Sequence, residues 1–336
     1  MKSIFVHSYN DIISLDNLLS AWQEFIAGKK KKQDVQLFRL NLMDNTIRLH
    51  EDLSTQHYLH GGYHDFYITD PKRRHIHKAS VRDRLLHHAV YRILYPFFDR
   101  TFISDSYSCR TSKGLHKAIN QFKSFHLKVS QNNTITCWVL KCDIRKFFAN
   151  IDHGILIKIL ESYIADKKIL WLLKNIINSF GFDEQKIKGV PLGNLTSQLF
   201  TNVYMNIFDQ YVKHKLKAKY YIRYADDFVF LSDDKEWLYK VIPQIRAYLA
   251  VELKLSLHKD KLFINTFASG MDFLGWVHFS NHRVLRNTTR KRAIAHLEEN
   301  PNNATLQSYL GLFSHGNTYK LQKQIKAWYW MWGLVD

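Results

Sequence analysis

Two mostly apolar, strand-like runs on either side of two adjacent aspartates form the clearest hydrophobic and polar pattern in the chain. Residues 220–232 read YYIRYADDFVFLS, two runs of aromatic and β-branched residues that favour strands. The pattern predicts a tight hairpin with Asp226 and Asp227 at its tip. A buried strand is predicted over Ile135–Asp143, which ends on a third carboxylate. Because burying neighbouring negative charges is costly without a compensating cation, these positions indicate a cation site.

Helical periodicity accounts for most of the remaining chain. Helices are predicted at residues 12–27, 35–48, 81–98, about 115–128, after 153, 168–179, 196–215 and 235–252, with three short helices after residue 292. Further strand segments are predicted at 261–265 and in a hairpin at 273–276, and a tight loop at 189–193. This mixture of helices and antiparallel hairpins predicts an α+β fold.

Composition indicates the kind of partner. The 336 residues include 48 Lys and Arg against 30 Asp and Glu, a net charge of +18, and 14% aromatic residues. This excess favours a polyanion, most simply nucleic acid, whose bases can stack on aromatic rings. Three cysteines, no apolar run of membrane-spanning length and no signal-peptide pattern predict a cytoplasmic protein without membrane insertion or a zinc site.

Three carboxylates suggest a reaction. Asp143, Asp226 and Asp227 can hold two Mg²⁺ ions about 4 Å apart for in-line phosphoryl transfer, as a polymerase palm requires. Taken alone, an Asp-Asp pair is more often an ordinary turn.

The order of motifs resembles that of prokaryotic reverse transcriptases related to group II intron enzymes. Tyr224-Ala225-Asp226-Asp227 is similar to the family's Tyr-x-Asp-Asp box, and the likeness extends over about residues 65–290. It implies a right-hand polymerase fold. Its expected parts are an N-terminal extension (1–64), fingers (65–130), a palm of antiparallel sheet with helices (131–280) and a small helical thumb (281–336).

The resemblance assigns roles around the carboxylates. Asp143, Asp226 and Asp227 would be catalytic metal ligands, together with the carbonyl of Ile144, for two Mg²⁺ ions that Mn²⁺ could replace. Lys261 would be the catalytic proton donor to the leaving pyrophosphate, although a lysine at a strand edge is more often simply solvated.

Other motifs would contact nucleotides. Phe148 would exclude a ribose 2′-OH, with Phe147 as the alternative if Phe148 belongs to the core. Cationic nucleotide contacts are expected from Lys72, Arg73, Arg74, Arg82, Arg84 and Arg110, some of which must bind template instead. Phe273, Leu274, Gly275 and Trp276 resemble the primer grip.

The loop that contains Leu192, Gly193 and Gln198 departs from the common reverse transcriptase pattern, which has Gln and Pro where this chain has Leu192 and Gln198. This form resembles enzymes of diversity-generating retroelements and some defence-associated enzymes. Because the loop would pack beneath the nascent base pair, the loss of an amide predicts tolerance of mismatches.

The C-terminal segment carries two basic groups expected to bind nucleic acid. They are Arg283, Arg286, Arg290, Lys291 and Arg292, then Lys320, Lys323 and Lys326. The second group lies on one helical face that either tracks RNA or merely solubilises the helix.

The sequence therefore predicts an RNA-directed DNA polymerase that copies a dedicated noncoding RNA template, using dNTPs to make DNA. Its setting would be a diversity-generating retroelement or phage defence, with an accessory subunit or a defence effector as partner. An RNA-directed RNA polymerase, a catalytically silent RNA-binding scaffold and a two-metal nuclease are the alternatives.

Overall fold

The computed structural model describes residues 4–69, 73–181, 187–299 and 301–332. The chain forms two compact units. Unit 1 contains Met1–Cys109, Ile144–Lys217 and Gln244–Leu257, and unit 2 contains Arg110–Asp143, Ala218–Pro243 and His258–Asp336. Within the described ranges, no helix is long and apolar enough to cross a bilayer.

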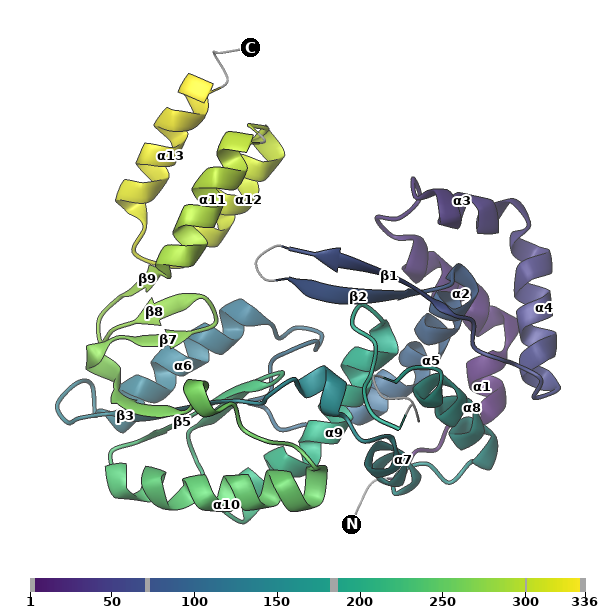
Figure 1. The fold of residues 1–336 in the computed structure, drawn as a ribbon, viewed down its shortest axis with the longest axis horizontal. Coiled ribbons are helices and arrows are strands. Elements are labelled where there is room, and N and C mark those ends of the chain that lie inside the picture. Colours follow the sequence, from purple (N-terminus) through teal and green to yellow (C-terminus); the bar gives the residue numbers. More distant parts are fainter. Residues whose placement is uncertain (1–3, 70–72, 182–186, 300, 333–336) are drawn as a thin grey trace. The chain divides into compact units, whose positions relative to one another are not determined.

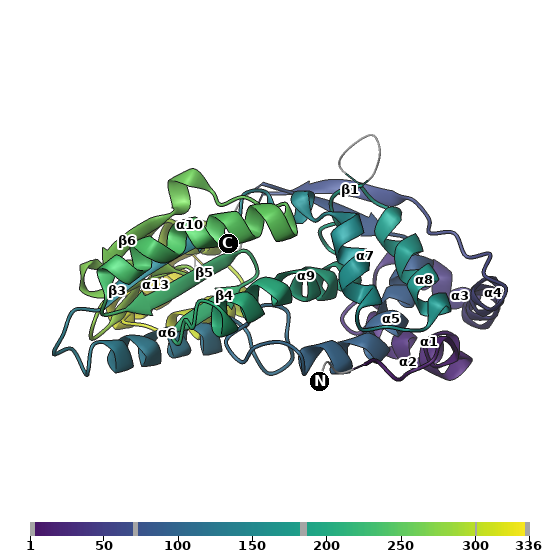
Figure 2. The same ribbon diagram turned by 90° about the horizontal axis from the view of Figure 1, so that it is seen from below.

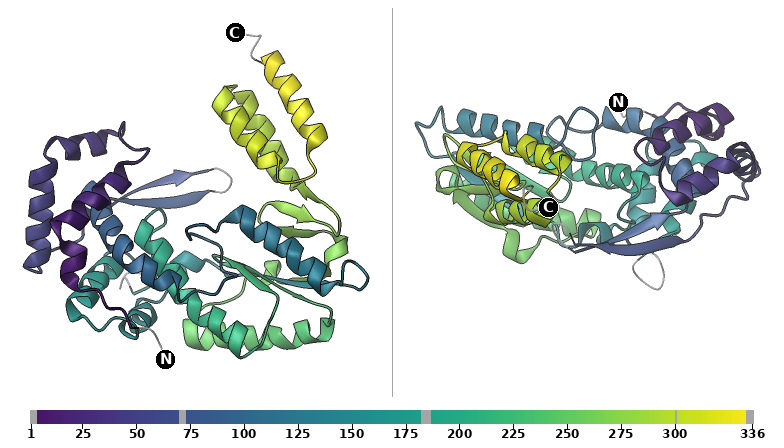
Figure 3. Two further views of the ribbon diagram at one scale, coloured as in Figure 1. Left: turned by 180° about the vertical axis from the view of Figure 1, so that it is seen from behind. Right: turned by 90° about the horizontal axis from the view of Figure 1, so that it is seen from above.

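Unit 1 is a helical cluster with a two-stranded hairpin. Its elements are α1 (Tyr9–Ile13), α2 (Leu15–Ile26), α3 (Gln33–Leu40), α4 (Leu42–Ser54), β1 (Tyr63–Ile68), β2 (Arg74–Ala79), α5 (Val81–Asp99), η1 (Phe147–Asn150), α7 (His153–Glu161), α8 (Lys167–Asn178) and α9 (Leu195–His214). Helix α5 packs against α2 and α9, and α7 packs against α8 and α9 (Figure 2). The antiparallel hairpin β1–β2 extends beyond these helices (Figures 1 and 3).

Unit 2 contains the larger sheet and three C-terminal helices. Its elements are α6 (Leu115–Val129), β3 (Trp138–Asp143), β4 (Tyr221–Tyr224), β5 (Asp227–Ser232), η2 (Lys259–Lys261), β6 (Phe263–Thr266), η3 (Phe267–Ser269), β7 (Met271–Phe273), β8 (Trp276–His278), β9 (Arg283–Leu285), α11 (Asn287–Glu299), α12 (Asn303–Phe313) and α13 (Tyr319–Trp332). Helix α10 (Lys235–Leu253) contributes residues to both units.

The sheet of unit 2 places the three aspartates. Four antiparallel strands run in the order β4-β5-β3-β6, and β7-β8-β9 form a second antiparallel sheet. Val139, Leu140, Phe228 and Phe230 are fully buried, as expected for central strands rich in β-branched and aromatic residues. Helix α6 packs on β4 and β5 (Figure 1). The predicted α+β class is confirmed.

Several predicted elements differ in the structure. The strand predicted from Ile135 begins at Trp138, and the helix predicted at 12–27 is interrupted at Ser14, whose ψ of 144° is not helical. The helix predicted at 35–48 is two helices, α3 and α4, joined at Asn41, whose φ of −119° and ψ of 42° are not helical. The side-chain amide of Asn45 donates to the Phe38 carbonyl at 3.0 Å and supports this junction. The strand predicted from Lys261 begins instead at Phe263, because residues 259–261 form a 3₁₀ turn.

Candidate active site

Three aspartates lie at one end of the four-stranded sheet. Asp143 is the last residue of β3, and Asp227, the first of β5, is its direct partner in the antiparallel register. Directly opposed residues point to the same face with Cβ atoms about 5 Å apart. Asp226 is the second residue of the two-residue turn Ala225-Asp226 between β4 and β5, so it directly precedes Asp227. The sheet register therefore brings together two carboxylates, Asp143 and Asp227, that are 84 residues apart in the sequence.

The turn that carries Asp226 has an unusual backbone. Ala225 adopts φ 56°, a conformation uncommon for residues other than glycine. Arg223, whose side chain is fully buried, donates from Nη1 to the Ala225 carbonyl at 3.1 Å. This bond fixes the turn and thus the position of the two aspartates that follow.

Each carboxylate of the opposed pair has a lysine partner. Lys261 Nζ lies 2.8 Å from Asp143 Oδ2. Lys141 Nζ lies 3.6 Å from Asp227 Oδ2 and donates to the Asp272 carbonyl at 2.6 Å. Sequence reasoning missed Lys141, although a lysine two residues before Asp143 on a strand must share its face, and that spacing was the available signal.

Burial dominates the electrostatics of Asp227. It raises the pKa of this carboxyl from 3.8 to about 6; Lys141 opposes the rise, while Asp143 and Asp226 add to it. Oδ1 of Asp227 is buried and makes no hydrogen bond within the described part of the chain. A cation close to Asp227 would therefore stabilise the ionised form of this carboxyl.

The donor set fits a hard divalent cation. Carboxylate oxygens are the ligands that Mg²⁺ prefers, and the orphaned Oδ1 of Asp227 is one such oxygen. Within the described ranges, however, no three His, Cys, Asp or Glu side chains converge as a preformed coordination sphere. Asp143 and Asp227 are instead paired through Oδ2 with Lys261 and Lys141.

Ile144 and Phe148 belong to unit 1. Ile144 is buried and forms an isolated antiparallel bridge with Leu257. In η1, Phe147 is buried, whereas Phe148 is only half-buried, and the two rings meet edge to face with centroids 5.5 Å apart. Of the two candidates for contact with a sugar, Phe148 is thus the more accessible.

The loop before α9 connects η1 to the hairpin. The Phe148 carbonyl accepts from Val190 N at 2.9 Å, and the Leu192 carbonyl accepts from His77 N of β2 at 3.0 Å. Gly193 has φ 105°, and an added Cβ would lie 3.0 Å from Ile76 Cγ2. Within unit 1 the loop is therefore packed against β2. Gln198 is half-buried in α9.

The cations expected to bind nucleotide have different surroundings. Lys72 lies outside the described residues. Arg73 and Arg74 are exposed at the end of the hairpin, and the Arg73 guanidinium lies 4.1 Å from the centroid of the Tyr67 ring. Arg110 is half-buried in the turn before α6 of unit 2.

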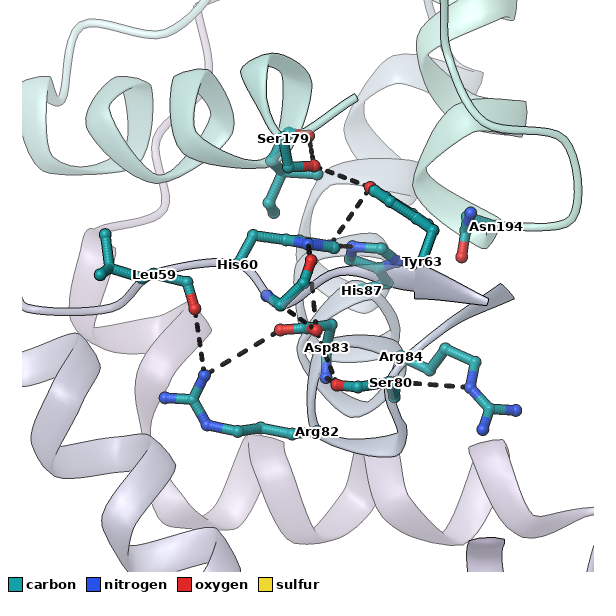
Figure 4. A network of polar contacts seen from close by, with 12 residues as sticks. Leu59, His60, Tyr63, Ser80, Arg82, Asp83, Arg84, His87, Ser179 and Asn194 are labelled. Atoms are coloured by element: carbon teal, nitrogen blue, oxygen red, sulfur yellow. Dashed lines mark hydrogen bonds and ion pairs between the residues drawn. The ribbon is translucent and has the colours of Figure 1, made fainter. Parts of the chain in front are cut away.

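Arg82 and Arg84 are engaged in ion pairs within unit 1. Arg82 Nη2 lies 2.5 Å from Asp52 Oδ2, and Arg84 Nη2 lies 2.5 Å from Asp34 Oδ2. Between them, the buried carboxylate of Asp83 accepts from Ser80 Oγ at 2.6 Å at the start of α5 (Figure 4). Both guanidiniums are therefore paired with carboxylates of the same unit, and the nucleotide contact expected from the sequence stays a prediction.

The same network anchors the base of the hairpin. Asp83 also accepts from Tyr58 Oη at 2.7 Å and from Gly61 N at 3.1 Å. His60 Nε2 lies 3.1 Å from His87 Nε2 (Figure 4), and burial holds the pKa of His87 well below its usual range. A neutral imidazole at His87 suits this buried position.

The primer-grip candidate is a tight hairpin of unit 2. Phe273 and Trp276 pair across a two-residue turn in which Leu274 has φ 52° and Gly275 φ 86°, the positive values of a type I′ turn. Trp276 is buried in the core formed with α11–α13. A Cβ added at Gly316 would lie 2.0 Å from the indole, so glycine is required there.

The C-terminal cations divide by environment. Arg283 donates from Nη1 to Asn120 Oδ1 at 3.0 Å and from Nε to the His315 carbonyl. Arg286 forms an ion pair with Asp272. Arg290 and Lys291 are exposed and Arg292 is half-buried in α11, while Lys320, Lys323 and Lys326 are exposed on α13.

Comparisons with a family model and with individual proteins relate this chain to the same family. The model of the family described as "Reverse transcriptase (RNA-dependent DNA polymerase)" matches residues 69–278, more than half of the chain. The chain is 27% identical over 281 residues to Protein YkfC of Escherichia coli (strain K12), covering 72% of this chain and 71% of YkfC. It is 22% identical over 333 residues to Group II intron-encoded protein LtrA of Lactococcus lactis subsp. cremoris, covering 77% of this chain and 53% of LtrA. The chain thus spans about half the length of LtrA.

Proposed function

We propose that this chain, which belongs to the reverse transcriptase family of RNA-dependent DNA polymerases, copies a dedicated RNA template into DNA at Asp143, Asp226 and Asp227. The observation that carries the proposal is the register of β3 and β5, which opposes Asp143 and Asp227 beside Asp226. Two Mg²⁺ ions held there would activate the primer hydroxyl and stabilise charge on the leaving pyrophosphate.

The lysines have distinct proposed tasks. Lys261, 41% exposed and 2.8 Å from Asp143, can reach solvent and a leaving group, and we propose it as the proton donor. Lys141, only 10% exposed, links Asp227 to the backbone of β7. We propose that it positions Asp227 relative to the hairpin at Phe273–Trp276, which we propose as the primer grip.

Further assignments extend the proposal. We retain 65–130 as fingers, 131–280 as palm and 281–336 as thumb. Phe148 is our candidate for excluding the 2′-OH, while Arg73 and Arg74 are our candidates for the triphosphate. The form of the loop at Leu192 and Gln198 supports a retroelement or defence setting. Sequencing RNA and DNA that copurify with the protein would identify the template.

The test is Mg²⁺-dependent incorporation of dTTP on poly(rA) primed with oligo(dT). Asp226→Asn and Asp227→Asn should each lower the rate on the order of a hundredfold or more, because each removes a charged ligand. The matched control is Asp260→Asn, whose side chain is 90% exposed in the same unit. Near-normal extension by either active-site variant would refute the site, and equal use of ribonucleotides would favour an RNA polymerase.

A further inference from the structure

Three adjoining hollows cross the surface of unit 2. The first, about 530 Å³, lies along α6 and includes Asn120, Lys123 and Lys128. The second, about 350 Å³, shares Asn120 and Lys123 with the first and reaches Asn317. The third, about 720 Å³, shares Asn317 with the second and continues along α13 to Lys320. Because neighbouring hollows share lining residues, they follow one another along the surface.

All charged side chains that line this path within the described residues are basic. Basic side chains line every hollow: Lys123 and Lys128 in the first, Arg283 in the second, Arg290 and Lys320 in the third. No Asp or Glu lines any of them in the part of the chain that the structure describes. The side chain of Lys123 makes no ion pair or hydrogen bond within that part either. Such a path attracts a polyanion and releases its counterions on binding.

The middle hollow is held in shape by Arg283. Its guanidinium is fixed by bonds to Asn120 and to the His315 carbonyl and lies 5.7 Å from the centroid of the Trp276 ring. Asn317 N donates to the Arg283 carbonyl at 2.8 Å, which ties the loop after α12 to β9. The cation therefore sits in place before any ligand arrives, which lowers the entropy cost of binding.

Ring surfaces occur beside these cations. His282 is stacked on Phe279 with centroids 4.9 Å apart, and it is exposed. His315 is stacked on His116 at 3.5 Å. Tyr319, in the third hollow, is 76% exposed. Flat rings alternating with cations and asparagine amides suit unpaired bases, which stack on rings while their phosphates meet cations.

We propose that the three hollows form a track for a single strand of RNA, separate from the aspartate site. RNA is chosen as the bound strand because the proposed function requires an RNA template, so this inference rests on that function. A duplex would present its bases already stacked on each other and leave the rings unused, so the rings favour an unpaired strand.

The test measures binding of a fluorescent 12-nucleotide RNA of mixed sequence by anisotropy at several salt concentrations. Lys123→Ala with Lys128→Ala should weaken binding about tenfold at 0.15 M salt and flatten the salt slope by about 1.4, because each phosphate contact contributes about 0.7 on single strands. The matched control is Lys117→Ala with Lys240→Ala, two exposed lysines of the same unit that line none of the hollows. It should change affinity less than twofold.

A second variant separates stacking from charge. His282→Ala should weaken binding about fivefold with the salt slope unchanged, because stacking adds about 1 kcal/mol or more per base. Cross-linking with RNA that contains 4-thiouridine should label the peptides around residues 279–283 and 314–317. Equal effects of the lysine pair and its control, or no loss with His282→Ala, would overturn the track.

Failure of the track can be distinguished from failure of the polymerase. If wild type extends oligo(dT) on poly(rA), and the variant Lys123→Ala with Lys128→Ala binds the RNA as tightly as wild type, the track is refuted and the proposed function is kept. If the track variants weaken RNA binding but wild type incorporates no dNTP, the proposed function is refuted and the track is kept.

Discussion

Replacing Asp227 by Asn is expected to stabilise the metal-free protein while it removes DNA synthesis. The carboxyl of Asp227 is 22% exposed and has a pKa raised to about 6, mainly by burial. Each unit of pKa corresponds to about 1.4 kcal/mol, so keeping this group ionised at pH 7.5 costs about 3 kcal/mol. The neutral amide has nearly the same shape and avoids most of that cost.

The sign of the pH dependence follows from the raised pKa. Below pH 6 the folded protein takes up a proton at Asp227 that the unfolded chain, with a pKa near 3.8, does not yet bind. Wild type therefore gains stability from this group as pH falls from 7 towards 4. The advantage of Asp227→Asn should be full at pH 7.5 and should vanish near pH 4.

Thermal melts in EDTA provide the assay. A gain of about 1 to 3 kcal/mol raises the melting temperature by roughly 3 to 9 °C for a unit of this size. Adding Mg²⁺ should stabilise wild type by mass action and leave Asp227→Asn nearly unchanged. Asp260→Asn, at an exposed carboxylate, is the control and should not shift the melt. A variant that melts lower than wild type, or a gain that is the same at every pH, would refute the reasoning.

Three further predictions concern substrate, positioning and fidelity. Phe148→Val should raise incorporation of ribonucleotides relative to deoxynucleotides about tenfold or more, measured by competition between dTTP and UTP; unchanged selection would assign Phe148 to the core. Lys141→Met keeps the buried aliphatic stem but loses the bond to the Asp272 carbonyl, so primer extension should slow about tenfold while Lys141→Arg retains more activity; equal loss in both would contradict a positioning role. Leu192→Gln should lower misincorporation in sequenced products, and an unaltered error spectrum would exclude this loop as the source of mismatch tolerance.

The hairpin that carries Asp226 and Asp227 could be predicted from local patterns in the sequence. Runs of aromatic and β-branched residues on both sides of a two-residue turn predict the two strands, and the alternation of side chains along a strand then fixes the face of each one. Asp143 followed from the same rule at the end of a buried strand. The partner Lys141 could have been found in this way, since the alternation that places Asp143 also places the residue two before it.

Long-range ion pairs could not be predicted from spacing. Arg82 and Arg84 lie in a basic segment that suggests phosphate binding, yet the structure pairs them with Asp52 and Asp34, 30 and 50 residues earlier in the chain. Which carboxylate reaches which guanidinium depends on how α3 and α4 pack near α5. The break at Asn41 was missed for a related reason, since a side-chain bond and packing override a weak helical preference.

The distribution of acidic residues explains how a chain of net charge +18 can carry both a carboxylate site and a path for a polyanion. Around the active site, acid is matched by base: Asp143 with Lys261, Asp227 with Lys141 and Asp272 with Arg286. These pairs are local, and screening removes their influence beyond about 10 Å. Since the three hollows contain no acidic lining residue among those described, their cations keep their full attraction for phosphate. Moving a carboxylate into the path, as in Asn317→Asp, should therefore weaken RNA binding more than the same charge change at the exposed Asn303, and equal effects at both positions would show that only net charge matters.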